Sequence, residues 1–230
     1  MLTNSQRYLF PSNWLLGKLL LAHRLWGPLV LVLGFGLSSI ANSLYGQQRL
    51  EIGSPAPGWV DLLGTDDQKH SLADLQDYDF VVVCFTCNTC PYAIDYEDRL
   101  IALHQRFQDG TNPKVAIVAI NSNATPDDQL DKMKERSEQK RFPFWYLRDD
   151  DHQVAKEFKA LYTPEFFVLD RERKIRYQGA LDNKTKAEEV TQQFVVEVIE
   201  TLAKGQEPST TYQPARGCKI RFPKPKRDLD

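Results

Sequence analysis

The amino-acid sequence predicts an α/β fold in which a central mixed β-sheet is flanked by helices. Two runs, FVVVCF at 80–85 and VAIVAI at 115–120, are continuously apolar and rich in β-branched residues. Such runs are typical of strands buried on both faces of a sheet that helices cover. Residues 91–107 lie between the runs and have the apolar spacing of a helix. A strand, a helix and a second strand in this order form a βαβ unit, so we expect the two strands to be parallel.

The other elements follow from the same patterns of apolar spacing and turn residues. Residues 60–63 and 69–71 flank the turn-rich sequence GTDDQ and predict a short hairpin. Pro91 suits the first turn of the helix at 91–107, where its missing N–H group costs nothing. In chain order we then expect a helix at 127–139, a short strand at 144–147, a helix at 153–161, strands at 163–170 and 175–179, and a helix at 188–204.

The first 45 residues have the features of a signal peptide or a membrane anchor. No Asp or Glu occurs before Glu51, and 24 uncharged residues separate Arg24 from Arg49. Basic, acid-free flanks before an apolar run are typical of such segments. A buried core helix is the alternative, but the run lacks alternating polar and apolar faces. We therefore expect residues from 44 onward to lie outside the cytoplasm, either released by cleavage or tethered to a membrane through residues 25–45. Disulfides persist in such an oxidising compartment.

The remainder of the chain divides into one domain and a tail. The Pro/Gly-rich sequence GSPAPGWV at 53–60 marks the start of a domain that we place at 53–204. Gly205 ends the last helix, and we expect residues 205–230, which are proline-rich and basic near the end, to form an extended tail. The formal net charge of −2 gives no indication of nucleic-acid binding.

Cys87 and Cys90 form a C-x-x-C motif at the junction between an expected strand and an expected helix. A helix N-terminus stabilises a thiolate, which is the reactive form of cysteine. A C-x-x-C motif beside a βαβ unit therefore indicates a redox-active pair. One alternative is an iron–sulfur or zinc site that also uses Cys84 and the distant Cys218. The metal site is disfavoured because an extended strand cannot turn three thiolates onto one cluster. The other alternative is that the cysteines are ordinary small core residues, and it suits Cys84 best.

A second motif, YTPEFFVLD at 162–170, places Thr163 and Pro164 directly before an apolar strand. The chain resembles the thioredoxin-like superfamily in three stretches, VVVCFTCNTCPY, VAIVAINSN and YTPEFFVLDRERKIRYQG. The last of these contains this motif. The similarity is greatest to its redoxin branches, which include the alkyl hydroperoxide reductase/thiol-specific antioxidant type and extracytoplasmic thiol-disulfide oxidoreductases. The resemblance implies a thioredoxin-like fold. It also implies that Pro164 is a cis-proline facing the dithiol and that Thr163 offers backbone hydrogen bonds to an extended substrate.

The same resemblance implies a thiol-disulfide oxidoreductase. Cys87 is then the attacking thiolate and Cys90, expected one turn into the helix, is the resolving thiol. Its partners are protein thiols or disulfides and a thiol electron donor, and no cofactor and no metal are implied. A peroxiredoxin-like peroxidase is one alternative, although the pattern P-x-x-x-[ST]-x-x-C fails whether it is counted back from Cys87 or from Cys90. A non-catalytic binding domain of the same fold is the other.

Two further residues bear on the chemistry of the pair. Thr89 occupies a place where relatives with this kind of site often have histidine, and losing a potential imidazolium should leave Cys87 less acidic and the pair less oxidising. Cys218, in ARGCKIRF, is a candidate third thiol. From the sequence it could pair with Cys84, reach the dithiol or remain free, because a disulfide depends on a Cα–Cα distance that sequence does not give.

Overall fold

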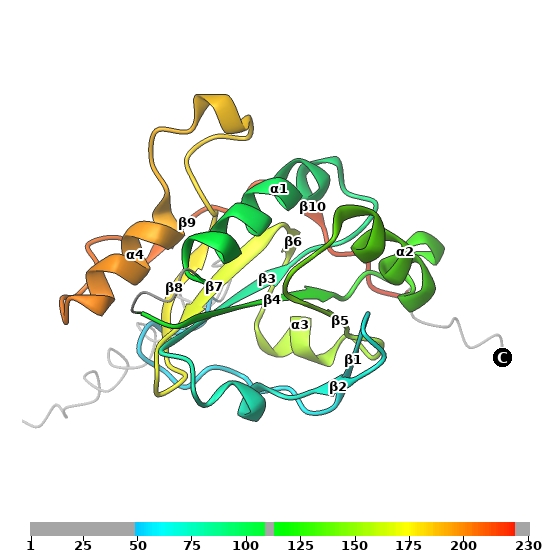
Figure 1. The fold of residues 1–230 in the computed structure, drawn as a ribbon, viewed down its shortest axis with the longest axis horizontal. Coiled ribbons are helices and arrows are strands. Elements are labelled where there is room, and N and C mark those ends of the chain that lie inside the picture. Colours follow the sequence, from blue (N-terminus) through cyan, green and yellow to red (C-terminus); the bar gives the residue numbers. More distant parts are fainter. Residues whose placement is uncertain (1–48, 109–112, 224–230) are drawn as a thin grey trace, which may run out of the picture. The chain divides into compact units, whose positions relative to one another are not determined.

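A computed structural model describes residues 49–108 and 113–223, which form a mixed β-sheet with helices on both of its faces (Figure 1). The expected signal or anchor segment at 1–45 lies outside the described residues. Within the described ranges, no helix is both long enough and apolar enough to span a membrane.

The strands and helices occupy the following residues. The strands are β1 (Leu62–Gly64), β2 (Lys69–His70), β3 (Phe80–Phe85), β4 (Val115–Asn121), β5 (Trp145–Arg148), β6 (Tyr162–Thr163), β7 (Glu165–Leu169), β8 (Ile175–Gly179), β9 (Tyr212–Gln213) and β10 (Cys218–Lys219). The helices are α1 (Pro91–Arg106), α2 (Leu130–Lys140), α3 (Gln153–Glu157) and α4 (Phe194–Ala203), with short 3₁₀ turns η1 (Leu72–Leu75), η2 (Pro126–Asp128) and η3 (Ala187–Glu189).

The sheet has the strand order β2-β1-β5-β4-β3-β7-β8-β9. The central strands β3 and β4 are parallel, as the βαβ pattern predicts, and β4 is also parallel to β5. On its other side β3 pairs with β7 in the antiparallel sense, and the expected hairpin of β1 and β2 is antiparallel too. The prediction of a central mixed sheet is therefore confirmed.

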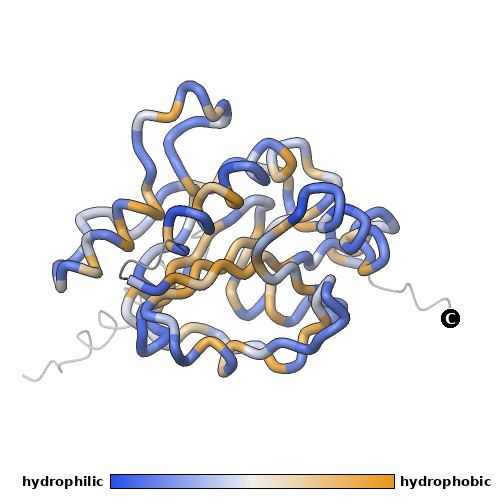
Figure 2. The backbone as a smooth tube through the Cα atoms, in the orientation of Figure 1, coloured by the Kyte–Doolittle hydropathy of each residue, from blue (hydrophilic) through white to orange (hydrophobic). Residues whose placement is uncertain are grey.

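Alternation along β3 divides the core between the two faces of the sheet. One face carries Val82 and Cys84 and packs against apolar residues of α1 and α4. The opposite face carries Val81 and Val83 and packs against α3 and the segment that precedes the sheet. Figure 2 shows the apolar residues gathered along the central strands and the polar residues along the outer loops. Because both faces are covered, the C-x-x-C motif, which follows β3, lies at an end of the sheet.

Three helices differ in extent from their expected ranges. The polar helix expected at 127–139 is divided into η2 and α2, because Gln129 is extended between them. The helix expected at 153–161 ends at Glu157, since Lys159 has a positive φ of 55°. The helix expected at 188–204 begins only at Phe194. Before it, the side chain of Asn183 accepts hydrogen bonds from the backbone N–H groups of Thr191 and Gln192, which holds this part of the chain in a loop.

The tail is extended, as expected, and two short strands fix it to the domain. β9 pairs with β8 in the parallel sense and becomes an edge strand of the large sheet. β10 pairs with β6 in the antiparallel sense, and its register sets Cys218 opposite Thr163. This second pairing brings the far end of the described chain to the C-x-x-C motif.

Candidate active site

The dithiol lies at the end of β3, where the chain turns into α1. Cys87 follows β3 by two residues, and Cys90 is the N-cap residue of α1, with Pro91 at the first helical position. Pro91 has the expected place, but Cys90 caps the helix and does not lie one turn into it. Both cysteine residues are buried, at 3% and 2% exposure, and they pack with Ala93 and Cys218 in a small cluster. The helix N-terminus therefore acts most directly on Cys90.

Thr163 and Pro164 lie against the dithiol, and the peptide bond between them is cis, as the resemblance implies. The Thr163 hydroxyl is 3.3 Å from Cys87 Sγ. The Cys90 thiol donates to the Thr163 carbonyl oxygen over 3.0 Å. A single residue on one loop thus contacts both sulfurs, with its side chain on Cys87 and its backbone on Cys90.

Cys218 is the third thiol of this site. Its backbone N–H donates to Cys90 Sγ over 3.4 Å, and its side chain packs against the cluster of Cys87, Cys90 and Ala93 and lowers the pKa of Cys90. Of the three placements that the sequence left open, the structure shows Cys218 beside the dithiol. None of the four cysteines forms a disulfide in this structure.

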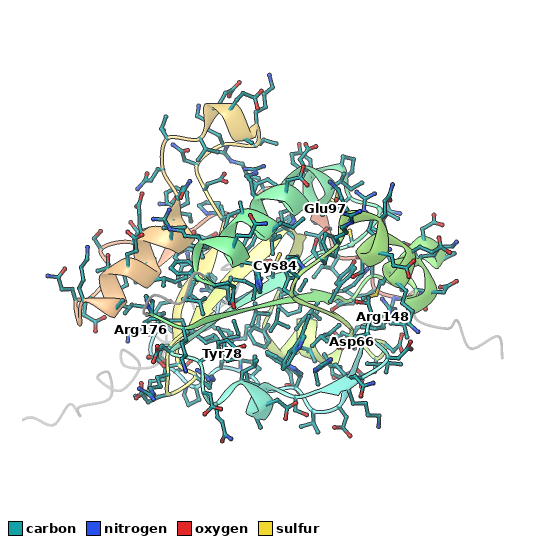
Figure 3. The ribbon with its side chains drawn as sticks, in the orientation of Figure 1. Asp66, Tyr78, Cys84, Glu97, Arg148 and Arg176 are labelled. Carbon is teal, nitrogen blue, oxygen red and sulfur yellow. The ribbon has the colours of Figure 1, made fainter. Side chains whose placement is uncertain are left out.

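Cys84 does not belong to this cluster. It is fully buried in the core on the α1 side of the sheet, among residues such as Val82 and Phe166 (Figure 3). The expectation that Cys84 is a core residue is confirmed. An arrangement in which Cys84, Cys87 and Cys90 bind one metal is not present in the described part of the chain, since the strand separates Cys84 from the pair.

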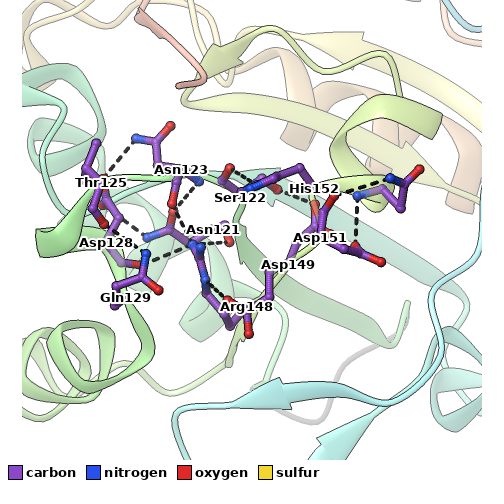
Figure 4. Close-up of polar contacts among 12 residues, drawn as sticks. Asn121, Ser122, Asn123, Thr125, Asp128, Gln129, Arg148, Asp149, Asp151 and His152 are labelled. Atoms are coloured by element: carbon purple, nitrogen blue, oxygen red, sulfur yellow. Dashed lines mark hydrogen bonds and ion pairs between the residues drawn. The ribbon is translucent and has the colours of Figure 1, made fainter. Parts of the chain in front are cut away.

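The loop that carries the dithiol is held by a buried carboxylate, Asp128. Its oxygens accept hydrogen bonds from the Asn88 backbone N–H at 2.7 Å and from the Thr89 hydroxyl at 2.9 Å. Further donors come from Asn121, Asn123 and Thr125 (Figure 4). Burial alone would raise the pKa of Asp128, but these hydrogen bonds outweigh it and hold the pKa below its usual value. Asp128 is therefore a fixed negative charge beside the loop.

The two thiols of the motif titrate as a pair. Their mutual hydrogen bond lowers the pKa of Cys90 to about 4, against the effect of burial, and the same hydrogen bond together with burial raises the pKa of Cys87. The interaction between the two thiols thus favours a single thiolate in the pair. The Thr163 carbonyl oxygen can only accept a hydrogen bond, so its contact with Cys90 favours the form that has the proton on Cys90. Transfer of the shared proton between the two sulfurs would interconvert the form with the proton on Cys87 and the form with the proton on Cys90.

Sequence reasoning did not identify two buried carboxylates near the pair. Asp128 lies in NATPDD, which the sequence analysis used only as part of a helix start. Glu165 follows Pro164 and accepts the backbone N–H groups of Leu161 and Tyr162 at 2.8 and 3.0 Å, and burial raises its pKa. An acidic residue inside an otherwise apolar strand was the available signal for Glu165. For Asp128 the signal was a cluster of Asn, Thr and Asp directly after a buried strand.

Comparison with solved structures identifies two similar proteins without a stated function. One is an uncharacterized conserved protein from Geobacillus kaustophilus, with 30% identity and a TM-score of 0.69 over 77% of this chain and 94% of that chain. The other is a hypothetical protein from Sinorhizobium meliloti, with 28% identity and a TM-score of 0.70 over 76% and 97% of the two chains. Both are therefore similar over nearly their whole length.

A third structure extends the similarity of fold to a redox protein. It is a proposed protein disulfide isomerase from Bacteroides thetaiotaomicron, with 19% identity and a TM-score of 0.51 over 67% of this chain and 91% of that chain. No functionally curated protein matched the sequence. Residues 52–178, more than half of the chain, match the model of the AhpC/TSA family. This range contains the dithiol, the Asp128 loop and the cis-proline, and the chain belongs to the thioredoxin-like AhpC/TSA family.

Proposed function

We propose that this protein is a thiol-disulfide oxidoreductase that uses Cys87 and Cys90 as its redox pair. The observation that carries the proposal is the contact of both sulfurs with Thr163, directly before a cis-proline. The pair is buried, yet the interaction between its two thiols lowers the pKa of Cys90 and favours one thiolate in the pair. A charged sulfur at the end of a rigid strand is the form in which cysteine attacks a disulfide.

Cys87 is the attacking sulfur in this proposal. Cys90 is enclosed by the Thr163 carbonyl oxygen, the Cys218 backbone and the start of α1, whereas the other contacts of Cys87 are the hydroxyl groups of Thr163 and Thr89. This difference in contacts supports attack by Cys87 and not by Cys90. For the attack the shared proton moves to Cys90, where the Thr163 carbonyl oxygen accepts its hydrogen bond.

The reaction then proceeds by two exchanges. The Cys87 thiolate attacks one sulfur of the substrate disulfide, a mixed disulfide forms, and the other substrate sulfur leaves as a thiolate that takes up a proton. Cys90 loses its proton and attacks Cys87 Sγ, which releases the second substrate thiol and leaves a Cys87–Cys90 disulfide. Two electrons pass from the protein to the substrate, and an external thiol donor must return them. The same steps in reverse oxidise a dithiol substrate.

We place this reaction outside the cytoplasm, with protein thiols or disulfides as substrates. The acid-free apolar segment at 25–41 supports that location. N-terminal sequencing of protein from separated cell fractions tests it. A full-length N-terminus on protein recovered from the cytosol contradicts the location and leaves the dithiol chemistry unaffected.

A glutathione redox titration of the full chain, with alkylation and peptide mass analysis, tests the function. The expected result is one two-electron transition confined to Cys87 and Cys90. A midpoint near about −270 mV indicates a reductant and one near about −120 mV indicates an oxidant. If the two cysteines stay reduced across the whole range, the chain is a binding domain without redox activity.

A trapping experiment tests the order of attack. Cys90→Ser removes the resolving thiol, so a substrate disulfide should remain covalently bound to Cys87. The matched variant Cys87→Ser should not accumulate this adduct. Adducts that form through Cys90 or Cys218 instead contradict the assignment of Cys87.

Membership of the AhpC/TSA family supports a second candidate, direct peroxide reduction. Against it, Val83 and Cys87 occupy the Pro and Thr/Ser places of the peroxidatic pattern when the pattern is aligned on Cys90. Steady-state consumption of hydrogen peroxide with a thiol reductant separates the two activities. A peroxidase consumes peroxide catalytically, whereas an oxidoreductase of the proposed kind reduces disulfides and leaves peroxide largely unchanged.

A further inference from the structure

The segment that carries Cys218 is built into the active site. Its backbone is bonded directly after the cysteine: Ile220 N–H donates to the Leu161 carbonyl oxygen at 2.9 Å, and Ala124 N–H donates to the Arg221 carbonyl oxygen at 2.7 Å. The side chain of Ile220 is buried in the core. The structure thus holds Cys218 in one position, against Cys90.

Gly217 explains how the tail approaches so closely. A Cβ atom at this position would lie 2.0 Å from the Thr163 carbonyl oxygen and 2.6 Å from its carbonyl carbon. Backbone atoms cannot move aside as the end of a side chain can, so only glycine permits this approach. The Gly-Cys sequence therefore brings Cys218 next to Thr163, the residue that also contacts Cys87 and Cys90.

We propose that Cys218 is a third redox thiol of this site, and that a Cys87–Cys90 disulfide is exchanged within the molecule for a disulfide between Cys90 and Cys218. This inference rests on the proposed function, because the Cys87–Cys90 disulfide must form first. Cys218 is placed to attack Cys90 in particular, since its backbone N–H donates to Cys90 Sγ and its side chain packs against the cluster that contains Cys90.

The exchange is balanced without any other reactant. Cys218 Sγ loses its proton and attacks Cys90 Sγ, the bond between Cys90 and Cys218 forms, and the bond between Cys87 and Cys90 breaks. Cys87 leaves as a thiolate and takes up the proton that Cys218 gave up. The molecule remains oxidised by two electrons, and the attacking sulfur is again a thiol.

The charge on the pair controls when Cys218 reacts. Burial, the hydrogen bond with Cys90 and the charge of Cys90 raise the pKa of Cys218 to about 11, while Arg221 opposes them. In the reduced protein Cys218 is therefore a poor nucleophile. Once Cys90 is part of a disulfide its charge is gone, so the Cys218 thiolate forms more readily.

The exchange would also lock the tail over the loop that is expected to bind substrate. β10 already occupies the backbone edge of Thr163, where the resemblance to thioredoxin-like proteins implies pairing with an extended substrate. A Cys90–Cys218 disulfide would make that cover covalent. The oxidised molecule would then hold a free Cys87 beside a closed edge.

Disulfide mapping of the full chain tests the inference. Cys84, Cys87 and Cys90 lie in one tryptic peptide, 70–99, and Cys218 lies in another, 217–219. After stepwise oxidation and alkylation, the wild type should first show a disulfide within peptide 70–99 and later a disulfide that joins the two peptides. Oxidised Cys87→Ser should show only the joined pair, linked through Cys90.

Gly217→Ala is the sharper variant, because it keeps all four thiols and moves the tail from Thr163. It should lose the joined pair and keep the disulfide within peptide 70–99. Gly58→Ala is its matched control, since nothing lies within 4 Å of a Cβ atom at that position and its disulfides should match the wild type.

Two results overturn the inference in different ways. A Cys87→Ser protein that stays fully reduced, under conditions where the wild type has formed its Cys87–Cys90 disulfide, rejects the role of Cys218 and leaves the proposed function intact. A wild type that forms no disulfide at all rejects the proposed function, and this inference with it.

Discussion

Cys84 and Cys87 are almost equally buried, at 0% and 3% exposure, but their surroundings differ in kind. Cys84 lies in β3 among apolar side chains, and its one polar contact is a long one, 3.8 Å, to the Phe85 carbonyl oxygen. Cys87 lies beyond the end of the same strand, with the Thr163 hydroxyl at 3.3 Å and the Cys90 thiol as hydrogen-bond partners. Hydrogen-bond partners, and not exposure, distinguish the two sites.

The contrast shows what makes a buried sulfur reactive. Burial, with a smaller contribution from the charge of Glu165, raises the pKa of Cys84 and keeps it neutral. In the pair, the thiol of one cysteine stabilises the thiolate of the other through a hydrogen bond, although both residues are almost as buried as Cys84. Three residues along the chain therefore separate a neutral core cysteine from the proposed redox pair, and substitutions in each place should have different kinds of effect.

The largest expected effect is the loss of disulfide exchange in Cys87→Ala and in Cys90→Ala. Either change removes one of the two sulfurs that the reaction needs, so turnover of a disulfide substrate should fall to the uncatalysed rate. Cys84→Ala should keep the activity and lower the free energy of unfolding by about 1 kcal/mol, because it removes one small buried group. Insulin reduction and denaturant unfolding measure the two quantities. Loss of turnover in a folded Cys84→Ala protein would remove the distinction between the two places.

The next effect concerns the carboxylate that holds the dithiol loop. Asp128→Asn replaces an acceptor of several hydrogen bonds by an amide, which should lower the free energy of unfolding by about 1–3 kcal/mol. Because the Asp128 charge is among the causes that raise the pKa of Cys87, the variant should also make the Cys87 thiolate form at lower pH. Urea unfolding and the pH dependence of alkylation check both. Asp127→Asn, at the exposed neighbouring carboxylate, should change neither.

The pH dependence of Asp128 follows from the same hydrogen bonds. Its pKa in the folded protein is lowered, so its contribution to stability is present above the pKa of the unfolded chain and is lost as the pH falls through the lower, folded value. Wild type and Asp128→Asn should therefore approach equal stability in strong acid. If the difference in the free energy of unfolding persists unchanged to low pH, the effect of the substitution comes from packing and not from the charge of Asp128.

A smaller effect separates the two thiols of the pair. The hydrogen bond from Cys87 is the largest cause that lowers the pKa of Cys90 to about 4, so thiolate should be present above that pH and disappear as the pH falls through it. Cys87→Ala removes the donor and should raise the pKa of Cys90, whereas Cys87→Ser keeps a hydroxyl donor and should raise it less. The ultraviolet absorbance of the thiolate, followed against pH, measures this. Equal values in the two variants would show that the hydrogen bond is not the cause.

The sequence predicted the parts of this site that depend on local pattern. The buried strand before Cys87 and the helix that starts at Pro91 follow from runs of residues near in the chain, and the cis bond between Thr163 and Pro164 follows from the family resemblance. The same local patterns gave the parallel pairing of β3 with β4.

Contacts between distant segments could not be predicted in this way. Asp128 meets Asn88 across 40 residues and Cys218 meets Cys90 across 128, and no local period records either contact. The helix at 188–204 was predicted too long for the same reason, because Asn183 holds residues of the preceding loop through its side chain. Local patterns and the family resemblance thus located the dithiol and the cis-proline segment, and left the contacts of Asp128 and Cys218 undetermined.

The smallest expected effect is at Thr89, whose hydroxyl donates to Asp128 at 2.9 Å and lies 3.9 Å from Cys87 Sγ. Thr89→His would place an imidazolium between that carboxylate and the sulfur. A cation there stabilises the reduced, thiolate form, so the reduction potential should rise, by about 30 mV for each ~1.4 kcal/mol of stabilisation. Thr89→Val is the control, because it removes the donor without adding charge and should not raise the potential. A Thr89→His protein with an unchanged or lower potential would mean that the fixed charge of Asp128, and not the residue between the cysteines, sets the chemistry of the pair.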